Sequence, residues 1–166
     1  MLYQLPNKYE YDLSQRELDV LVLYLQGKYH LEIASRLSIQ SKTLYHYLSM
    51  VKQKWGYKTQ IGLILEAIRR GYSDFYFDAY RDILDNHNRF SKLSPEEIEI
   101  IQYLFFDFTC REIAKISGCS PKTMEEKKSN IRRKLGVKNN FELVAVVLKY
   151  RKEVLLPLSV ELEGVV

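Results

Sequence analysis

Basic side chains gather in two short segments of the chain, where they could bind a polyanion. Residues 42–58 contain four lysines and no acidic residue, and residues 122–138 contain seven basic residues and two glutamates. The whole chain carries a net charge of +4, so the remaining residues sum to about −5. Positive charge concentrated in this way is the footprint that a nucleic-acid backbone requires. A solvated basic face without a partner is the alternative, and the agreement between two segments disfavours it.

Helical geometry selects the side chains that would face such a partner. Leu44, Leu48, Val51 and Trp55 recur at spacings of four, three and four, so they form the buried stripe of a helix. The opposite face would meet base edges through Lys42, Thr43, His46, Ser49, Met50 and Gln53, and in the second segment through Lys122, Thr123, Glu126, Ser129, Asn130 and Arg133. Nearer the phosphates we expect Lys52, Lys54, Lys58, Arg132, Lys134 and Lys138.

The second segment contains side chains with base-reading chemistry. Asn130 can bond adenine and Arg133 can bond guanine, each through two hydrogen bonds, and Glu126 can accept one from cytosine. Alternatively, Glu126 pairs with Lys122 and Glu125 pairs with Lys128, each across one helical turn, which is worth a few tenths of a kcal/mol. Both interpretations remain open.

The chain repeats itself with an offset of 80 residues and no gap. LSQRE at Leu13–Glu17 recurs as LSPEE at Leu93–Glu97, and Glu-Ile-Ala occurs at residues 32–34 and 112–114. Lys54, Gly56 and Lys58 recur as Lys134, Gly136 and Lys138. Shared turns and shared apolar positions in one register indicate a duplication.

Each copy has the pattern of four helices, which predicts an all-α protein. Ser14 and Ser94 have the spacing of N-caps, with a glutamate three residues later that completes a capping box. Gly56 and Gly136 are placed to end the third helices. A tight turn joins the second helix to a basic third helix, and this arrangement is a helix-turn-helix.

These motifs resemble the LuxR/GerE/FixJ-type DNA-binding domain of bacterial regulators. The opening at Leu13–Glu17 and the run SNIRRKLGV at Ser129–Val137 carry the resemblance, which covers residues 13–72 and 93–152. It implies two tandem four-helix LuxR-type helix-turn-helix domains. The family usually has a lysine two residues after the threonine of the third helix and a histidine two residues further on. In this sequence the first position holds Tyr45 or Glu125, and the second holds Tyr47 or Lys127. Lys127 is therefore a further candidate DNA contact, and the departures favour an alternative function in protein binding.

The predicted division of the chain follows the repeats. Residues 1–72 form the first domain with an N-terminal extension, and residues 93–152 form the second. Residues 73–92 form a short helical connector, since Asp74 could cap a helix from Phe75 to about Asp85. Residues 153–166 form an apolar tail.

The fourth helix of each copy is too apolar for a single buried face. We expect an interface through Ile61, Ile64, Leu65, Ile68, Phe141, Val144, Val147 and Leu148. In the resembled family this helix is commonly the dimer contact. Two copies in one chain suggest an intramolecular pseudo-dimer, and a homodimer between chains is the alternative.

The sequence gives little support for metal binding, catalysis or membrane insertion. His30, His46 and His87 are isolated, and Cys110 and Cys119 lack the spacing of a metal site. We therefore expect no enzyme, cofactor or metal, and the two cysteines to be reduced thiols. The chain has no apolar run of membrane-spanning length and no signal peptide, so we expect a cytoplasmic protein that does not bind a membrane.

The expected function is a transcriptional regulator that binds double-stranded DNA through the third helix of each repeat, without a sensory domain of its own. The alternative is an interaction protein that uses the same fold to bind another transcription regulator or RNA polymerase. A third possibility is that the first repeat binds DNA and the second binds protein.

Overall fold

The computed structural model describes residues 13–84 and 90–149, and within these ranges the chain is helical without strands. The first repeat consists of α1 (Gln15–Leu25), α2 (His30–Arg36), α3 (Ser41–Trp55) and α4 (Gln60–Ala67). A π-helical turn η1 (Ile68–Tyr72), α5 (Ser73–Leu84) and a 3-10 turn η2 (Phe90–Lys92) lead into the second repeat. The second repeat consists of α6 (Pro95–Phe105), α7 (Cys110–Ile116), α8 (Pro121–Leu135) and α9 (Asn140–Lys149). Each helix of the second repeat begins 80 residues after its counterpart, which confirms the all-α tandem fold.

The same capping device opens both repeats. The Ser14 hydroxyl accepts a hydrogen bond from the Glu17 backbone N–H at 3.3 Å, and the Glu17 carboxylate accepts one from the Ser14 N–H at 2.6 Å. Ser94 and Glu97 repeat this capping box at 3.3 and 2.8 Å. Both predicted N-caps are therefore confirmed, since each satisfies backbone donors that the first turn of a helix leaves unpaired.

The third helices end as the glycines predict. Gly56 has φ 77° and Gly136 has φ 69°, a left-handed conformation that favours glycine. The stripe of Leu44, Leu48, Val51 and Trp55 is buried on α3. On α8 the corresponding stripe is interrupted, because Leu48 has Lys128 as its counterpart. The Lys128 side chain is 15% exposed, and its ammonium lies 3.9 Å from the Glu125 carboxylate.

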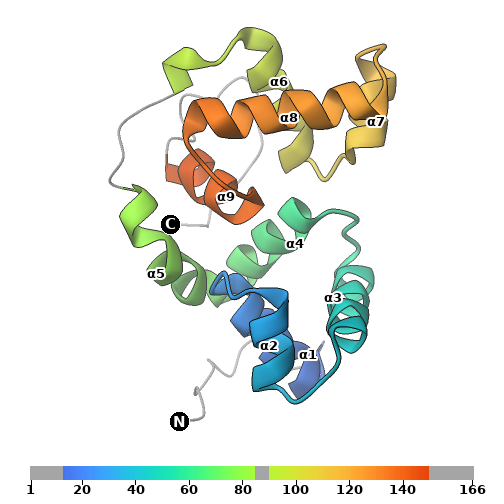
Figure 1. Cartoon of the computed structure of the whole chain (residues 1–166), viewed down its shortest axis with the longest axis vertical. Coiled ribbons are helices and arrows are strands. Elements are labelled where there is room, and N and C mark those ends of the chain that lie inside the picture. Colours follow the sequence, from blue (N-terminus) through green and yellow to red (C-terminus); the bar gives the residue numbers. More distant parts are fainter. Residues whose placement is uncertain (1–12, 85–89, 150–166) are drawn as a thin grey trace.

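The two repeats meet through their fourth helices. α4 packs against α9 at the centre of the molecule, between the first repeat and the second (Figure 1). Residues 141–147 of α9 are all buried, because α4 and α5 cover the sides of α9 that its own repeat leaves open. The wide apolar surface predicted for helix four is thus covered within the chain.

The connector is an ordered helix packed between the repeats. α5 lies against α9 and α1, and the chain turns into it at Gly71, which has φ 92°. The prediction that Asp74 caps this helix is wrong. Because α5 continues from η1 and begins at Ser73, Asp74 lies within its first turn.

The predicted N-terminal extension and apolar tail, with the predicted helix end at Asp85, lie outside the described residues, so the domain limits stay predictions. Among the helices of residues 13–84 and 90–149, none combines the length and the hydropathy of a membrane-crossing helix.

Candidate nucleic-acid interface

The predicted contact residues of α3 and α8 all lie at the protein surface. On α3 and the turn after it, Lys42, His46, Ser49, Gln53, Lys54 and Lys58 are exposed, whereas Thr43, Met50 and Lys52 are half-buried. On α8 and its following turn, Lys122, Glu126, Ser129, Asn130, Arg133, Lys134 and Lys138 are exposed, whereas Thr123, Lys127 and Arg132 are half-buried. Each helix therefore buries one stripe in its own repeat and presents the opposite face.

Two of the lysines predicted to contact phosphates also join helices within their own repeats. The Lys54 ammonium donates to the Glu17 carboxylate at 2.6 Å, and the Lys134 ammonium donates to Glu97 at 2.7 Å. The same glutamate thus caps the first helix of its repeat and binds a lysine in the last turn of the third helix. These ion pairs fix α3 and α8 on the helices beneath them.

Two further predicted contacts have acidic partners elsewhere. The Lys58 ammonium lies 2.7 Å from Glu112 of the second repeat, and Lys127 pairs with Glu96. The hydrogen bond from Lys58, followed by those from Thr109, lowers the pKa of Glu112 to about 2. The hydrogen bond to Glu96 raises the pKa of Lys127. All four cations keep exposed surface, but a phosphate would have to compete with a carboxylate for each.

The remaining cations are concentrated in the second repeat. No ion pair within the described residues engages Lys42 or Lys52 on α3, or Lys122, Arg132, Arg133 and Lys138 at α8. Arg111 and Lys115 on α7 are also exposed and unpaired there, and they were not predicted. Their spacing of four residues around buried Ile113 and Ala114 is the signal that places them outward.

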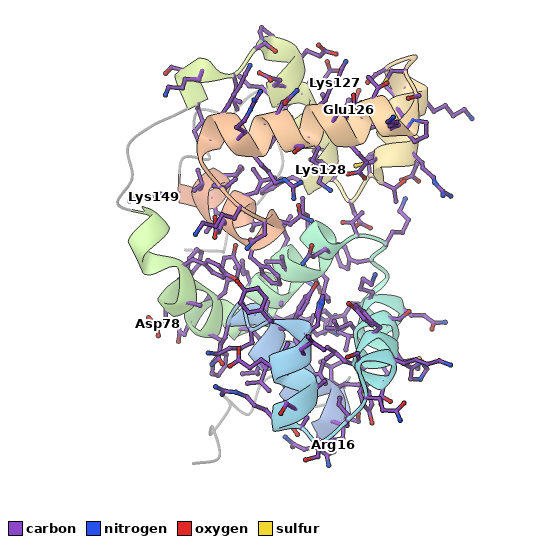
Figure 2. All side chains as sticks on the ribbon, in the orientation of Figure 1. Arg16, Asp78, Glu126, Lys127, Lys128 and Lys149 are labelled. Atoms are coloured by element: carbon purple, nitrogen blue, oxygen red, sulfur yellow. The ribbon has the colours of Figure 1, made fainter. Side chains whose placement is uncertain are left out.

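The base-reading candidates of α8 lie on its exposed face. The Arg133 guanidinium donates to the Asn130 side-chain oxygen at 3.2 Å, so these two side chains share one surface. Figure 2 shows Lys127 and Lys128 on opposite edges of α8. For Glu125 the predicted pairing with Lys128 is present at 3.9 Å. The predicted pairing of Glu126 with Lys122 is absent: Glu126 is exposed and has no ion pair with the described residues, so its carboxylate faces solvent.

The first repeat presents a different edge. Tyr29 is 83% exposed, Leu31 is 77% exposed and Tyr45 is 53% exposed at the start of α2 and on α3. The Tyr45 hydroxyl lies 3.0 Å from Nδ1 of His30, which fixes the Tyr45 ring across the two helices. The counterparts of the three exposed residues, 80 positions later, are Thr109, Arg111 and Glu125. The first repeat is therefore apolar where the second is polar and charged.

The predicted helix-four residues lie in the region where the repeats meet. Ile61, Ile64, Ile68, Phe141, Val144 and Val147 are buried, and Leu65 and Leu148 are half-buried. The amide of Asn140 donates to the Gln60 side-chain oxygen at 2.7 Å, and these two residues are counterparts in the repeat. The Tyr24 ring packs edge-on against Phe141, with 4.8 Å between centroids.

Asp107 joins the repeats, and the sequence did not reveal this role. Its carboxylate accepts hydrogen bonds from the backbone N–H groups of Lys58 and Thr59 at 2.8 and 2.9 Å, at the start of α4. A Cβ on Gly62 would lie 2.3 Å from this carboxylate, so only glycine allows the approach. Asp107 lies 48 residues from Thr59, and no local spacing predicts such a pair.

The isolated histidines and cysteines form no metal site in the part of the chain that the structure describes, where no group of three or more His, Cys, Asp or Glu side chains could hold an ion. His87 lies outside these residues. Burial raises the pKa of the Cys110 thiol to about 11, so this thiol is protonated near neutral pH.

The fold and the exposed basic faces of α3 and α8 define a helix-turn-helix protein of the DNA-binding class. The chain belongs to the family described as "Bacterial regulatory proteins, luxR family". The family pattern matches twice, at residues 12–67 and 91–147, and together these matches cover more than half of the chain. The resemblance drawn from the sequence is thereby confirmed, and the family consists of DNA-binding regulators.

Individual relatives agree with this assignment. The chain is 31% identical over 100 residues to the uncharacterized response regulatory protein YgeK of Escherichia coli strain K12, covering 58% of the chain and 67% of YgeK. It is 40% identical over 60 residues to the transcriptional regulatory protein DesR of Bacillus subtilis strain 168, covering 36% of the chain but only 30% of DesR. It is 39% identical over 59 residues to the spore germination protein GerE of the same organism, covering 36% of the chain and 80% of GerE. No solved structure gives a significant match.

Proposed function

We propose that the protein is a transcriptional regulator that binds duplex DNA through α3 and α8. The observation that carries the proposal is a set of cations on α8 and the turn after it that have no acidic partner among the described residues: exposed Lys122, Arg133 and Lys138, and half-buried Arg132. Cations left unpaired on one face of a helix-turn-helix are available to displace the counterions of DNA phosphates. Most of the chain outside the two basic segments is net negative, so it would not attract DNA.

The contacts divide into two kinds in this proposal. Arg132 and Lys138 bind phosphates and set the position of α8, whereas Asn130 and Arg133 reach base edges in the major groove. Lys54 and Lys134 act mainly within the protein, because Glu17 and Glu97 already hold their ammonium groups. We further propose that the activity follows the abundance of the protein or a partner, rather than a sensory domain within residues 1–166.

Paired substitutions test which helices bind DNA. Lys42→Gln with Lys52→Gln removes unpaired cations from α3, and Arg132→Gln with Lys138→Gln does so at α8. Each pair should lower the dependence of the binding constant on salt by about two ion equivalents, measured by fluorescence anisotropy on one duplex.

Arg16→Gln is the control, because Arg16 is an exposed cation of α1 outside the predicted contact faces of α3 and α8, and it lies at the opposite end of the molecule from α8 (Figure 2). It should leave the salt dependence unchanged. An unchanged salt dependence in both paired variants contradicts the proposal, and a change in the α8 pair alone contradicts docking by α3.

A second candidate function is protein binding by the first repeat. The exposed Tyr29, Leu31 and Tyr45 favour it, because contiguous apolar side chains on a surface are typical of protein contacts. In that case Tyr29→Ser with Leu31→Ser would abolish regulation of a reporter gene in cells without changing DNA affinity in vitro. Parallel loss of both activities would assign these side chains to the DNA interface instead.

A further inference from the structure

We infer that a single chain reads an asymmetric DNA site with two unlike halves, rather than an inverted repeat. This inference rests on the proposed DNA binding and concerns the class of target. Two identical helix-turn-helix domains related by a two-fold axis read a palindrome, because protein and operator share the symmetry. The repeats of this chain depart from such symmetry in their contacts and in their reading faces.

A two-fold interface is reciprocal, so that each contact recurs with the counterpart residues exchanged. The bond between Gln60 and Asn140 satisfies this rule trivially, because the two residues are each other's counterparts. The cap of α4 does not satisfy it. The N–H of Lys58 donates to Asp107 of the other repeat at 2.8 Å, whereas the N–H of its counterpart Lys138 donates to Glu142 of its own repeat at 2.6 Å.

The counterpart of Asp107 has a different neighbour. It is Gly27, and a Cβ there would lie 2.2 Å from the Tyr80 hydroxyl oxygen of α5. The first repeat therefore meets the connector where the second repeat meets α4. Among whole helices, the contact of α4 with α6 has a counterpart in the contact of Tyr24 on α1 with Phe141 on α9, but α5 packs against both α9 and α1.

α5 fixes this arrangement in place. Tyr76 is fully buried, and its hydroxyl donates to the backbone carbonyl of Phe141. The Tyr80 ring stacks on the Phe141 ring with 6.0 Å between centroids. Because these contacts bury a rigid aromatic cluster, the fold sets the orientation of the repeats. Reorienting them on a palindromic site would cost the free energy of this packing.

The two reading faces also differ chemically. Counterpart positions carry His46 and Glu126, Met50 and Asn130, and Gln53 and Arg133, so few of the hydrogen bonds to bases could be the same. Only the lysine and threonine in the first turn and one serine are shared between the two faces. Even two-fold docking would thus read unlike half-sites.

Selection of duplexes from a random library by the full chain tests the inference. The enriched sequence should contain two unlike parts without inverted symmetry, and the mass of the complex should correspond to one chain per duplex. Asn130→Ala should weaken discrimination in one part about tenfold, and Gln53→Ala should do so in the other part only. Both side chains are exposed, and circular dichroism would verify that each variant is folded.

Two results overturn the inference while leaving DNA binding intact. One is an enriched inverted repeat that binds two chains, and the other is a loss of discrimination in the same part for both variants. The control Arg16→Gln should select the wild-type sequence. If no duplex binds even at low salt, the proposed function itself fails, and this outcome is distinct from the other two.

Discussion

Two glutamates of this fold each cap a helix and also form an ion pair with a lysine. Glu17 caps α1, binds Lys54 on α3 and is 4% exposed, and Glu97 repeats the arrangement with Lys134. The capping boxes follow from local spacing, so the sequence predicts them. The ion pairs do not follow from it, because their partners lie 37 residues apart and meet only when the helices pack. The sequence could therefore identify basic residues, but it could not separate those that are free to bind a phosphate.

Removing the Glu17 side chain should destabilise the first repeat. Glu17→Ala deletes half of a capping box and leaves Lys54 without its partner, so the free energy of unfolding should fall by about 1 to 2 kcal/mol in urea denaturation. Glu126→Ala is the control, since that carboxylate is exposed and without an ion pair among the described residues, and its effect should stay within about 0.5 kcal/mol. Equal effects would show that the buried pair contributes nothing.

The same carboxylates predict how stability depends on pH. Burial alone would raise the pKa of Glu17 and Glu97, but hydrogen bonds from the paired lysines and capping serines outweigh it and lower both below 4.5. A lowered pKa in the folded state means that the contribution is fully present above pH 4.5 and is lost as the pH falls through the folded-state pKa.

Urea denaturation at a series of acidic pH values measures this dependence. The free energy of unfolding of the wild type should decrease below pH 4.5, and that of the double variant Glu17→Gln, Glu97→Gln should decrease less steeply. A double variant with the same dependence as the wild type would assign the acid sensitivity to other groups, such as Glu66, whose pKa is also lowered.

At the scale of helices, the repeat in the sequence was sufficient to place α1–α4 and α6–α9. Each turn carries its own local signal, such as Pro121 in the first turn of α8 and the glycine after it. The start of the connector helix was harder to predict. Aspartate is a common capping residue, which suggested Asp74, but η1 leads directly into α5 at Ser73. Which surfaces α5 covers depends on Tyr76 and Tyr80 meeting Phe141, 65 residues beyond Tyr76, and no periodicity reports such a contact.

The close approach of α5 to the first repeat can be tested at a glycine. Gly27 and Gly118 both have positive φ, 72° and 63°, but only at Gly27 would an added Cβ meet another group, the Tyr80 hydroxyl. Gly118→Ala should cost about 1 kcal/mol from backbone strain alone. Gly27→Ala should cost about 2 to 4 kcal/mol, because Tyr80 must also move. Thermal or urea unfolding compares the two variants, and equal losses would argue against the packing of α5 on Gly27.

On the scale of the whole molecule, α4 and α9 cover each other's apolar faces. The sequence predicted that these helices need a second surface, and it offered two ways to supply one. The structure contains the contact within one chain, with Asn140 and Gln60 bonded at its edge. This leaves the family's usual dimer helix without a large free apolar face in the described residues.

The protein should therefore be a monomer in solution. Light scattering at micromolar concentrations should give a mass near 19.7 kDa, since little apolar surface remains on helix four to drive association. The variant Asn140→Leu lacks the hydrogen bond to Gln60 between the fourth helices. It serves as the control for residual association through that region. A wild type that is dimeric at all accessible concentrations would favour assembly between chains.

The affinity of the full chain for duplex DNA at two salt concentrations tests the central proposal most directly. If about six cations contact phosphates, the affinity should fall roughly a thousandfold between low and physiological salt, and the Arg132→Gln, Lys138→Gln variant should show a shallower fall. Absence of binding to any duplex at low salt, or binding that is insensitive to salt, would contradict DNA recognition through α3 and α8.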